Sequence, residues 1–276
     1  MPEEIDLDAY LARIGLKSRP AADPEGLAAV QRAHRLSIPF ENLDVILGRG
    51  ISLDPGAIFD KLVTRRRGGY CFEQNGLFGD ALAALGFTTR PLLARVWLGA
   101  TETPPRTHTL NLVTIEGTSW IADAGFGGSY SLPMPLAEGE ALGPDGARHC
   151  LSRDGVHGWV LDRLGNPATT DGRGAEQGWV RQYSFTTDPV WPADLAQANH
   201  FTATVPGGRF TSCVVASMVL PNGFASLVDR AYSRTSASGT EQSEITSEKM
   251  LRLRLSLMFG IDLTTEEVAA LGLFPA

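Results

Sequence analysis

A glycine pair directly before a tyrosine and a cysteine constrains this chain more than any other stretch of its sequence. The pair, Gly68-Gly69, lies between two segments in which apolar residues recur with helical spacing. Because glycine readily adopts the backbone conformations that end a helix, the pair predicts a break between two helices. The second helical pattern begins at Phe72 and stops at Gly86, so Cys71 is expected in or beside the first turn of a helix.

The first turn of a helix is a suitable place for a reactive thiol. Unpaired backbone N–H groups point out of that turn, and the helix dipole favours negative charge there. Both effects favour the thiolate of Cys71, and the same N–H groups are able to stabilise an oxyanion on a substrate carbonyl. The alternative is a buried cysteine that packs as a small apolar residue. We expect that alternative for Cys150 and Cys213, which lie in strand patterns without a glycine turn.

The composition is that of an ordinary globular protein. The chain has 276 residues, of which 43% are apolar, and a formal net charge of −7. This negative balance argues against a protein built mainly to hold nucleic acid or an anionic membrane. The three cysteines are far apart and form no CxxC pair, which is typical of a reducing compartment and indicates neither a zinc site nor a disulfide framework.

The sequence carries no pattern of export or membrane insertion. The N-terminal residues are acidic and lack the basic and apolar regions of a signal peptide, and no apolar run approaches transmembrane length. We therefore expect a cytoplasmic protein. The histidines have no partners at metal-ligand spacing, so no metal site is expected. The sequence leaves open whether the protein is a monomer or a homodimer.

Residues 1 to about 86 have the pattern of a helical bundle. Asp23-Pro24 and Asp54-Pro55 each place a helix-capping side chain before a proline at the first helical position. Between them, Pro39 interrupts the helical pattern and predicts a bend. We expect the cysteine helix to lie inside this bundle.

Residues 87–187 change to a strand pattern. Residues 108–115 alternate between polar and apolar, and the Glu116-Gly117 turn leads into a strand that ends in a glycine-rich loop at residues 124–128. Further strands are predicted at residues 149–153, 159–164 and 179–185. Short strands at this spacing predict a barrel or a sandwich.

The last third mixes both types of element. The turn Pro221-Asn222-Gly223 predicts a hairpin between strands at residues 211–220 and 224–232. The polar segment Thr235–Glu244 is expected to be a loop. The leucines of residues 251–258 predict a helix that Gly260 ends, and Thr264 and Glu267 have the spacing of a capping box for a final short helix.

A catalytic cysteine usually needs a base and a third group that orients the base. His108 lies about eight positions before the centre of the Glu116-Gly117 turn, and Asp123 lies about seven positions after it. Such positions are near cross-strand neighbours in an antiparallel hairpin, so the carboxylate is expected to reach one imidazole nitrogen. The other nitrogen would then face Cys71.

These residues give the chain a clear resemblance to a known family. The segment from Arg67 to Asn75, the strand that begins at His108, and the segment from Ala122 to Gly127 resemble the arylamine N-acetyltransferase family, and Pro39–Leu43 also matches its pattern. The resemblance implies an α+β fold of three parts with a cysteine-protease-like Cys-His-Asp core. The parts are an N-terminal helical bundle that carries the nucleophile (1–86), a central β-barrel that carries His108 and Asp123 (87–187) and a C-terminal α/β lid (188–276).

The resemblance also implies a reaction and a set of ligands. Cys71, His108 and Asp123 would form the catalytic triad of a ping-pong acetyl transfer from acetyl-CoA to an arylamine, arylhydrazine or N-hydroxyarylamine. The resemblance implies no metal cofactor and no nucleic-acid or membrane partner. The expected contacts are Phe40, Tyr70 and Phe126 for the acceptor, and Thr107, Phe126, Gly127 and Phe210 for the pantetheine arm of the cofactor.

Several basic residues near these segments have simpler interpretations. Arg65 and Arg66 are expected to be solvated, and Arg67 is expected to form a structural ion pair with Glu41 or Glu73. The glycine pair before Arg209 is a further candidate for holding a phosphate through backbone N–H groups.

Two other classes of function use the same residues. A hydrolase or an amide synthase would employ the same triad, and the difference is whether water or an amine takes the acyl group; a dry apolar pocket would favour the amine. The third hypothesis is a CoA-binding or aromatic-binding module in which the triad is silent and Cys71 has the reactivity of an ordinary exposed thiol.

Overall fold

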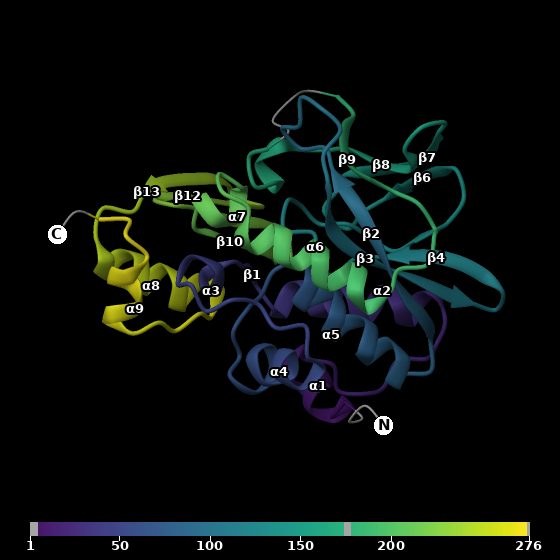
Figure 1. Ribbon diagram of the computed structural model, residues 1–276, viewed down its shortest axis with the longest axis horizontal. Helices are drawn as coiled ribbons and strands as arrows, with labels where there is room; N and C mark the ends of the chain where they lie inside the picture. Colours follow the sequence, from purple (N-terminus) through teal and green to yellow (C-terminus); the bar gives the residue numbers. More distant parts are fainter. Residues whose placement is uncertain (1–4, 174–177, 275–276) are drawn as a thin grey trace.

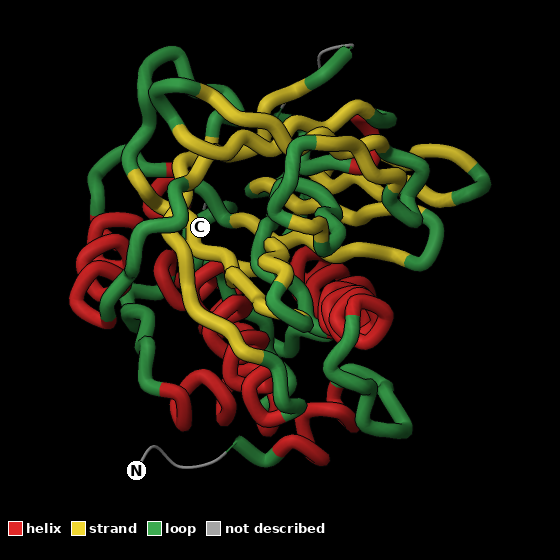
Figure 2. Tube along the Cα trace, turned by 90° about the vertical axis from the view of Figure 1, so that its right-hand side faces the viewer, coloured by secondary structure: helices red, strands yellow, loops and turns green. Residues whose placement is uncertain are grey.

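The computed structural model describes residues 5–173 and 178–274. Within them, the strands form two antiparallel sheets, and most of the N-terminal helices pack together below the sheets in the view of Figure 2. The expectation of a mixed helix-and-sheet fold with a barrel-like central sheet is confirmed. In the described part of the chain, no helix is both long and apolar enough to cross a membrane.

The N-terminal helices begin where the sequence places its caps. The side chain of Asp23 accepts a hydrogen bond from Gly26 N at 2.7 Å, and that of Asp54 accepts one from Ala57 N at 2.9 Å. The helices of this part are α1 (Leu7–Arg13), α2 (Pro24–Ser37), α3 (Leu43–Ile46), α4 (Pro55–Phe59), which continues as a π-turn (Asp60–Thr64), and α5 (Cys71–Ala84).

The predicted bend at Pro39 contains a short strand that links distant parts of the chain. Strand β1 (Phe40–Glu41) pairs with β10 (Val215–Leu220) of the C-terminal part, with Phe40 opposite Ser217. Phe40 also forms an isolated bridge to Gly69, directly before the cysteine helix. The N-terminal part is therefore tied to the C-terminal sheet at the point where α5 begins.

The larger sheet is curved and nearly closed, and its order is β5-β4-β3-β2-β9-β8-β7-β6. The predicted turn between β3 and β4 has positive φ at both Glu116 (47°) and Gly117 (81°), which fits the twist of a tight hairpin. The strands are β2 (Thr88–Val96), β3 (Arg106–Ile115), β4 (Thr118–Ala122), β5 (Met134–Pro135), β6 (Gly139–Leu142), β7 (Arg148–Asp154), β8 (Gly158–Leu164) and β9 (Val180–Phe185), with a 3₁₀ turn at Pro167–Thr169.

The C-terminal part contains two helices, α6 and α7, a second sheet, and a terminal pair of helices. The sheet order is β1-β10-β11-β12-β13, and α8 and α9 lie at the end of the molecule marked C in Figure 1. Gly260 ends α8 in the left-handed conformation (φ 65°), and Thr264 and Glu267 form the predicted capping box. The remaining elements are α6 (Pro192–Thr204), α7 (Arg209–Ser212), β11 (Gly223–Val228), β12 (Ala231–Ser236), β13 (Gly239–Glu244), α8 (Glu248–Phe259) and α9 (Thr265–Ala270).

Three sequence predictions in this part are wrong. The strand expected over residues 211–220 begins only at Val215, because Arg209–Ser212 form helix α7. The segment Thr235–Glu244 is not a loop, because it supplies the end of β12 and all of β13, which pair from Ala231 opposite Glu244 to Ser236 opposite Gly239. The strand expected over residues 224–232 is broken by a turn at Asp229, whose φ is 52°. Strand β13 forms the sheet edge with both faces largely exposed, so its sequence lacks the alternation that marks a half-buried strand.

Four of the hydrophobic clusters lie in the three parts of the chain and at the point where these parts meet. One lies among the N-terminal helices, one inside the larger sheet, and one between the second sheet and α8 and α9. The fourth joins all three parts of the chain around the start of α5 through Phe40, Tyr70, Cys71, Phe72, Leu93, Ala198 and Val215. The start of the cysteine helix is therefore the place where the three parts converge.

Candidate active site

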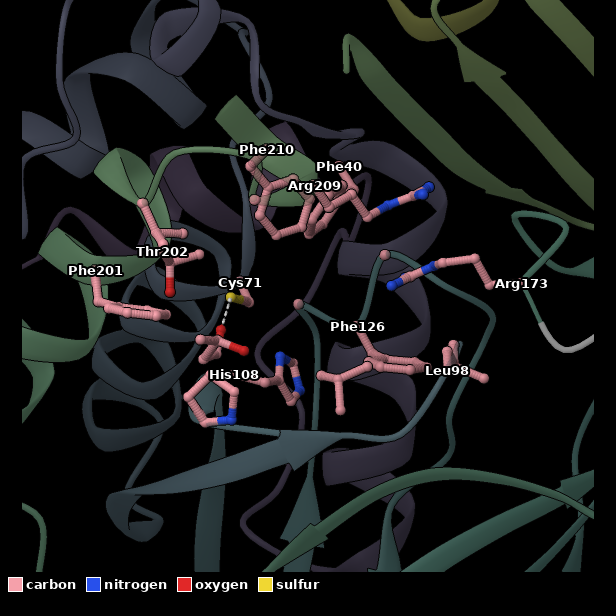
Figure 3. Close-up of a pocket in the computed structure, with 17 residues that line it drawn as sticks. Phe40, Cys71, Leu98, His108, Phe126, Arg173, Phe201, Thr202, Arg209 and Phe210 are labelled. Atoms are coloured by element: carbon pink, nitrogen blue, oxygen red, sulfur yellow. Dashed lines mark hydrogen bonds between the residues drawn. The ribbon is translucent and has the colours of Figure 1, made fainter. Parts of the chain in front are cut away.

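Cys71 is the first residue of α5, as the glycine pair predicts. The carboxylate of Glu73 accepts a hydrogen bond from Tyr70 N at 3.0 Å and so caps the helix. The Cys71 side chain is 3% exposed, and its Sγ lies 3.7 Å from the carbonyl oxygen of Thr107 (dashed line in Figure 3). The thiol therefore points from the helix start toward the beginning of the β3 strand that carries His108.

His108 and Asp123 form a buried pair beside this thiol. His108 Nε2 lies 2.7 Å from Asp123 Oδ2, which confirms that the two residues are close. Strand β4 ends at Ala122, opposite Asn111, so Asp123 follows the strand and its side chain reaches diagonally to His108. The carboxylate thus fixes the ring by accepting the Nε2 proton, which leaves Nδ1 to exchange a proton.

The two charges hold each other in their ionised forms. Burial lowers the pKa of His108, but the charge and hydrogen bond of Asp123, with a smaller contribution from Cys71, raise that pKa to about 10. Burial raises the pKa of Asp123, but His108 and the hydrogen bonds from Asn75 and Gly125 give a net lowering. The site therefore favours an imidazolium next to the Cys71 thiol at neutral pH.

The carboxylate of Asp123 is oriented by neighbouring amide groups. Its Oδ1 accepts hydrogen bonds of 2.9 Å from Asn75 Nδ2 and from Gly125 N. A Cβ on Gly125 would lie 2.5 Å from Asn75 Nδ2 and 2.9 Å from Cys71 Cα. Only glycine lets the loop after β4 approach the cysteine helix this closely.

Helix α2 holds the same loop from the other side. The guanidinium of Arg35 donates to the carbonyl oxygens of Ala124, Phe126 and Ser129 at 2.7–3.2 Å. One turn earlier, Gln31 Oε1 accepts from Asp123 N at 2.8 Å. Two buried polar side chains on one helix face therefore satisfy the backbone of a loop that has no secondary structure of its own.

A second set of buried charges lies under the helix start. We call it the buried ion cluster, and it consists of Glu41, Asp44, Lys61, Arg67 and Glu73. Arg67 contacts Glu41 at 2.8 Å, as predicted, while Lys61 contacts both Asp44 and Glu73 at 2.7 Å. The cluster ties β1, α3 and the π-turn to the first turn of α5.

A cavity of about 240 Å³ opens onto the thiol. Figure 3 shows Cys71 and His108 on its wall, with Phe40, Phe126 and Phe210 around them. The cavity is lined by Phe40, Cys71, Val96, Leu98, Pro105, Thr107, His108, Gly125, Phe126, Gly127, Arg173, Phe201, Thr202, Val205, Gly208, Arg209 and Phe210.

Tyr70 is the sequence-predicted pocket residue that does not line this cavity. Its ring is fully buried behind Phe210, at 5.7 Å between ring centroids, and its hydroxyl is hydrogen-bonded to the Asn199 side chain on α6. Tyr70 thus packs at the junction with α6, and its expected contact with an acceptor stays a prediction. Phe40, Phe126, Thr107, Gly127 and Phe210 all reach the cavity.

Part of the cavity lining and most of the side chains that support the site carry no clear signal in the sequence. Phe201, Thr202 and Val205 come from α6, where no local motif marks them. Arg35 and Gln31 lie on the buried face of α2 together with Leu27 and Val30, and only their i, i+4 spacing hints at a shared partner. In the described residues, no group of three or more His, Cys, Asp or Glu side chains is arranged to hold a metal ion.

Comparisons with known proteins agree with the geometry. Residues 23–268 match the model of a family described as N-acetyltransferase. The chain is 37% identical over 267 residues to an arylamine N-acetyltransferase of Mycobacterium tuberculosis, covering 94% of this chain and 90% of that protein.

Solved structures of the same kind superimpose on the chain. The arylamine N-acetyltransferase from Salmonella typhimurium has a TM-score of 0.88 at 32% identity, covering 99% of this chain and 100% of that one. That of Mycobacterium marinum, solved in complex with CoA, has a TM-score of 0.86 at 31% identity and covers 96% and 98%. The fold and the matched length define an acyltransferase. The chain belongs to the arylamine N-acetyltransferase family.

Proposed function

We propose that the protein transfers an acetyl group from acetyl-CoA to an arylamine, an arylhydrazine or an N-hydroxyarylamine through a thioester on Cys71. The observation that carries this proposal is the geometry of one cavity wall, where the helix-start thiol of Cys71 lies beside His108 and Asp123 is hydrogen-bonded to His108 Nε2. The names of the relatives and the CoA complex of the Mycobacterium marinum enzyme support the choice of substrates.

In the first half-reaction, Cys71 reacts as a thiolate whose proton is held by His108, and its sulfur attacks the carbonyl carbon of acetyl-CoA. The N–H groups of the first turn of α5 stabilise the negative charge that develops on the carbonyl oxygen. When the tetrahedral intermediate collapses, the bond to the CoA sulfur breaks and His108 gives its proton to the departing thiolate. Cys71 then carries the acetyl group and His108 is neutral.

In the second half-reaction, the acceptor nitrogen attacks the thioester carbon. Neutral His108 takes the proton that this nitrogen loses, the bond to Cys71 Sγ breaks, and the imidazolium–thiolate pair returns. Asp123 keeps the Nε2 proton in place throughout and so orients the ring. Apolar lining by Phe40 and Phe126 favours an aromatic amine over water in this step.

We further propose that the three parts of the chain divide this work. Residues 1–86 supply the nucleophile, residues 87–187 supply His108 and Asp123, and residues 188–276 cover the substrates. The last assignment is supported by α6 and α7, which contribute Phe201 and Phe210 to the cavity wall.

The proposal is tested by incubating the protein with acetyl-CoA and no acceptor, followed by intact mass measurement and peptide mapping. We expect one acetyl group on the peptide that contains Cys71, and its loss with formation of the acetamide when an arylamine is added. Cys71→Ala should take up no acetyl group, whereas the matched control Cys150→Ala should behave as the wild type, because Cys150 does not line the cavity.

Three results would contradict this assignment. An acetyl group on another residue would displace Cys71 as the nucleophile. Release of CoA without an adduct or an acetamide would indicate a hydrolase. Unchanged turnover by Cys71→Ala would exclude a thioester on this residue altogether.

A further inference from the structure

Two arginines share one buried aspartate at the cavity wall. Asp171 Oδ2 accepts hydrogen bonds from Arg173 Nε at 2.8 Å and from Arg209 Nη2 at 3.1 Å. The Asp171 side chain is 2% exposed, whereas those of Arg173 and Arg209 are 25% and 23% exposed. The cluster therefore has a buried anion at its base and two partly exposed cations above it.

This arrangement has a surplus positive charge and an unused donor. One carboxylate faces two guanidinium groups within the cluster, and the charge of Asp229 outside it gives Arg209 only a smaller compensation. Arg209 Nε is buried and has no hydrogen-bond partner among the described residues. Burial and the charge of Arg173 lower the pKa of Arg209, in agreement with two cations held close together. A buried donor without a partner is unfavourable, and an anion at this position would satisfy it.

The cluster is built into the walls of the cavity that contains the thiol. Asp171 N donates to Gly128 O at 2.8 Å, at the end of the loop that follows Asp123. Arg209 begins α7 next to Phe210, which packs on Phe40 at 5.7 Å between ring centroids. Figure 3 shows both guanidinium groups on one side of the cavity, with Phe201 and Thr202 on the other side of Cys71.

We propose that Arg173 and Arg209 bind a phosphate group of the acyl donor. This inference rests on the proposed function, in which the donor is acetyl-CoA. The acetyl carbon must reach Cys71, which is buried, so the rest of this long molecule extends outward along the cavity to its exposed part. The two partly exposed guanidinium groups lie on that wall, and their planar pairs of N–H donors match the geometry of phosphate oxygens.

The test compares two acyl donors in Arg209→Gln and Arg173→Gln. For acetyl-CoA, kcat/KM should fall about tenfold in each variant, because a charge-assisted contact is lost. For p-nitrophenyl acetate, which has no phosphate, kcat/KM should stay within about twofold. Arg209→Lys retains the charge without the fork and should show a smaller loss with acetyl-CoA. The matched control is Arg19→Gln, which removes an arginine from an exposed pair with Asp8 far along the chain.

Activity with p-nitrophenyl acetate also reports on folding, because a variant that fails to fold loses activity with both donors equally. If Arg209→Gln fails to fold, Arg173→Gln and Arg209→Lys still test the phosphate contact. Acetyl-pantetheine, which lacks phosphate, should be used equally well by the wild type and by the variants that fold. Increased ionic strength should reduce the difference between wild type and variants with acetyl-CoA.

Two outcomes would overturn the inference while leaving the proposed function intact. One is an equal kcat/KM for acetyl-CoA in wild type and both variants. The other is an effect limited to the acceptor, in which the variants lose 4-aminobenzoate but retain 4-methoxyaniline, because the arginines would then bind an acceptor carboxylate. Failure of the wild type to become acetylated by acetyl-CoA would instead overturn the proposed function.

Discussion

Two groups of buried charges lie beside the start of the cysteine helix, and they differ in how their charges balance. In the His108–Asp123 pair, one cation meets one carboxylate at 2.7 Å. In the buried ion cluster, the three carboxylates of Glu41, Asp44 and Glu73 face the two cations Lys61 and Arg67. At the rim of the cluster, Asp44 also contacts the more exposed Arg49 at 3.3 Å, which pairs with Glu267 as well. Both groups are shielded from water, so the balance of charge within each group decides which forms are stable.

The balanced pair stabilises both of its ionised forms. The pKa of Asp123 is lowered, so its contribution to folding is present above its ordinary pKa of 3.8 and is lost as the pH falls. The pKa of His108 is raised to about 10, so its contribution is complete below 6.5 and is lost as the pH rises toward 10. The pair is therefore maintained across neutral pH, where the proposed proton transfers take place.

The unbalanced cluster leaves one carboxyl group poorly compensated. Burial and the neighbouring Glu41 raise the pKa of Glu73 to about 7, although Lys61 opposes this rise. Lys61 itself has a raised pKa, because the attraction of its carboxylate neighbours exceeds the effect of its burial. A raised pKa of Lys61 and a raised pKa of Glu73 are compatible, because Lys61 is shared among several carboxylates and fully compensates none of them. We infer that the pair serves the proposed chemistry, whereas the cluster holds the start of α5 in place.

The largest expected effect follows from breaking the balanced pair. His108→Gln removes the group that is proposed to carry the proton in both half-reactions, and we expect acetyl transfer to fall by about 10²- to 10⁴-fold. Steady-state kinetics with acetyl-CoA and an arylamine measure this loss, and circular dichroism checks that the fold is retained. A turnover within threefold of the wild type would show that His108 is not the proton carrier.

A loss of stability is expected when a cation is removed from the cluster. Arg67→Leu leaves Glu41 buried without its partner, which should lower the free energy of unfolding by about 3–5 kcal/mol. The matched control is Arg65→Leu, because Arg65 pairs with Asp60 at the exposed surface; it should change stability by about 1 kcal/mol or less. Urea denaturation measures both values. Equal effects of the two variants would mean that burial does not distinguish these ion pairs.

A smaller, pH-dependent effect is expected at Glu73. Its raised pKa means that its contribution to stability is complete below 4.5 and is lost as the pH rises through about 7. The stability of wild type relative to Glu73→Gln should therefore fall over this interval, by on the order of 1–3 kcal/mol. Urea denaturation of both proteins at pH 4.5, 6 and 8 measures the difference. A difference that is constant with pH would contradict the raised pKa.

The parts of the site that could be predicted from the sequence are those with local signals. Glycine chemistry places Cys71 at a helix start, and the two positive φ angles of the Glu116-Gly117 turn fix the hairpin that brings Asp123 to His108. Each signal acts over a few residues, and the backbone geometry that it requires does not depend on the rest of the fold.

The remainder depends on contacts between residues far apart in the chain. Asp171 contacts Arg209 only because the loop after the 3₁₀ turn and α7 line the same cavity. Arg35 contacts the loop at 124–129 although Ala124 lies 89 positions further along the chain. The sequence predicts the Arg67 ion pair, yet it cannot count the charges of the buried ion cluster, because Lys61 and Asp44 join that cluster through the packing of the π-turn and α3.

The most direct test of the comparison measures the rate at which acetyl-CoA acetylates Cys71 in single-turnover experiments with Asp123→Asn and Glu73→Gln. Each variant replaces one buried carboxylate by its amide next to the same helix start. We expect Asp123→Asn to slow acetylation by about 10²- to 10⁴-fold, because the imidazole loses its orientation and its charge partner. Glu73→Gln should remain within about threefold of the wild type, because Glu73 touches the helix cap and not the reacting groups. Equal losses in both variants would contradict the division between a catalytic pair and a structural cluster.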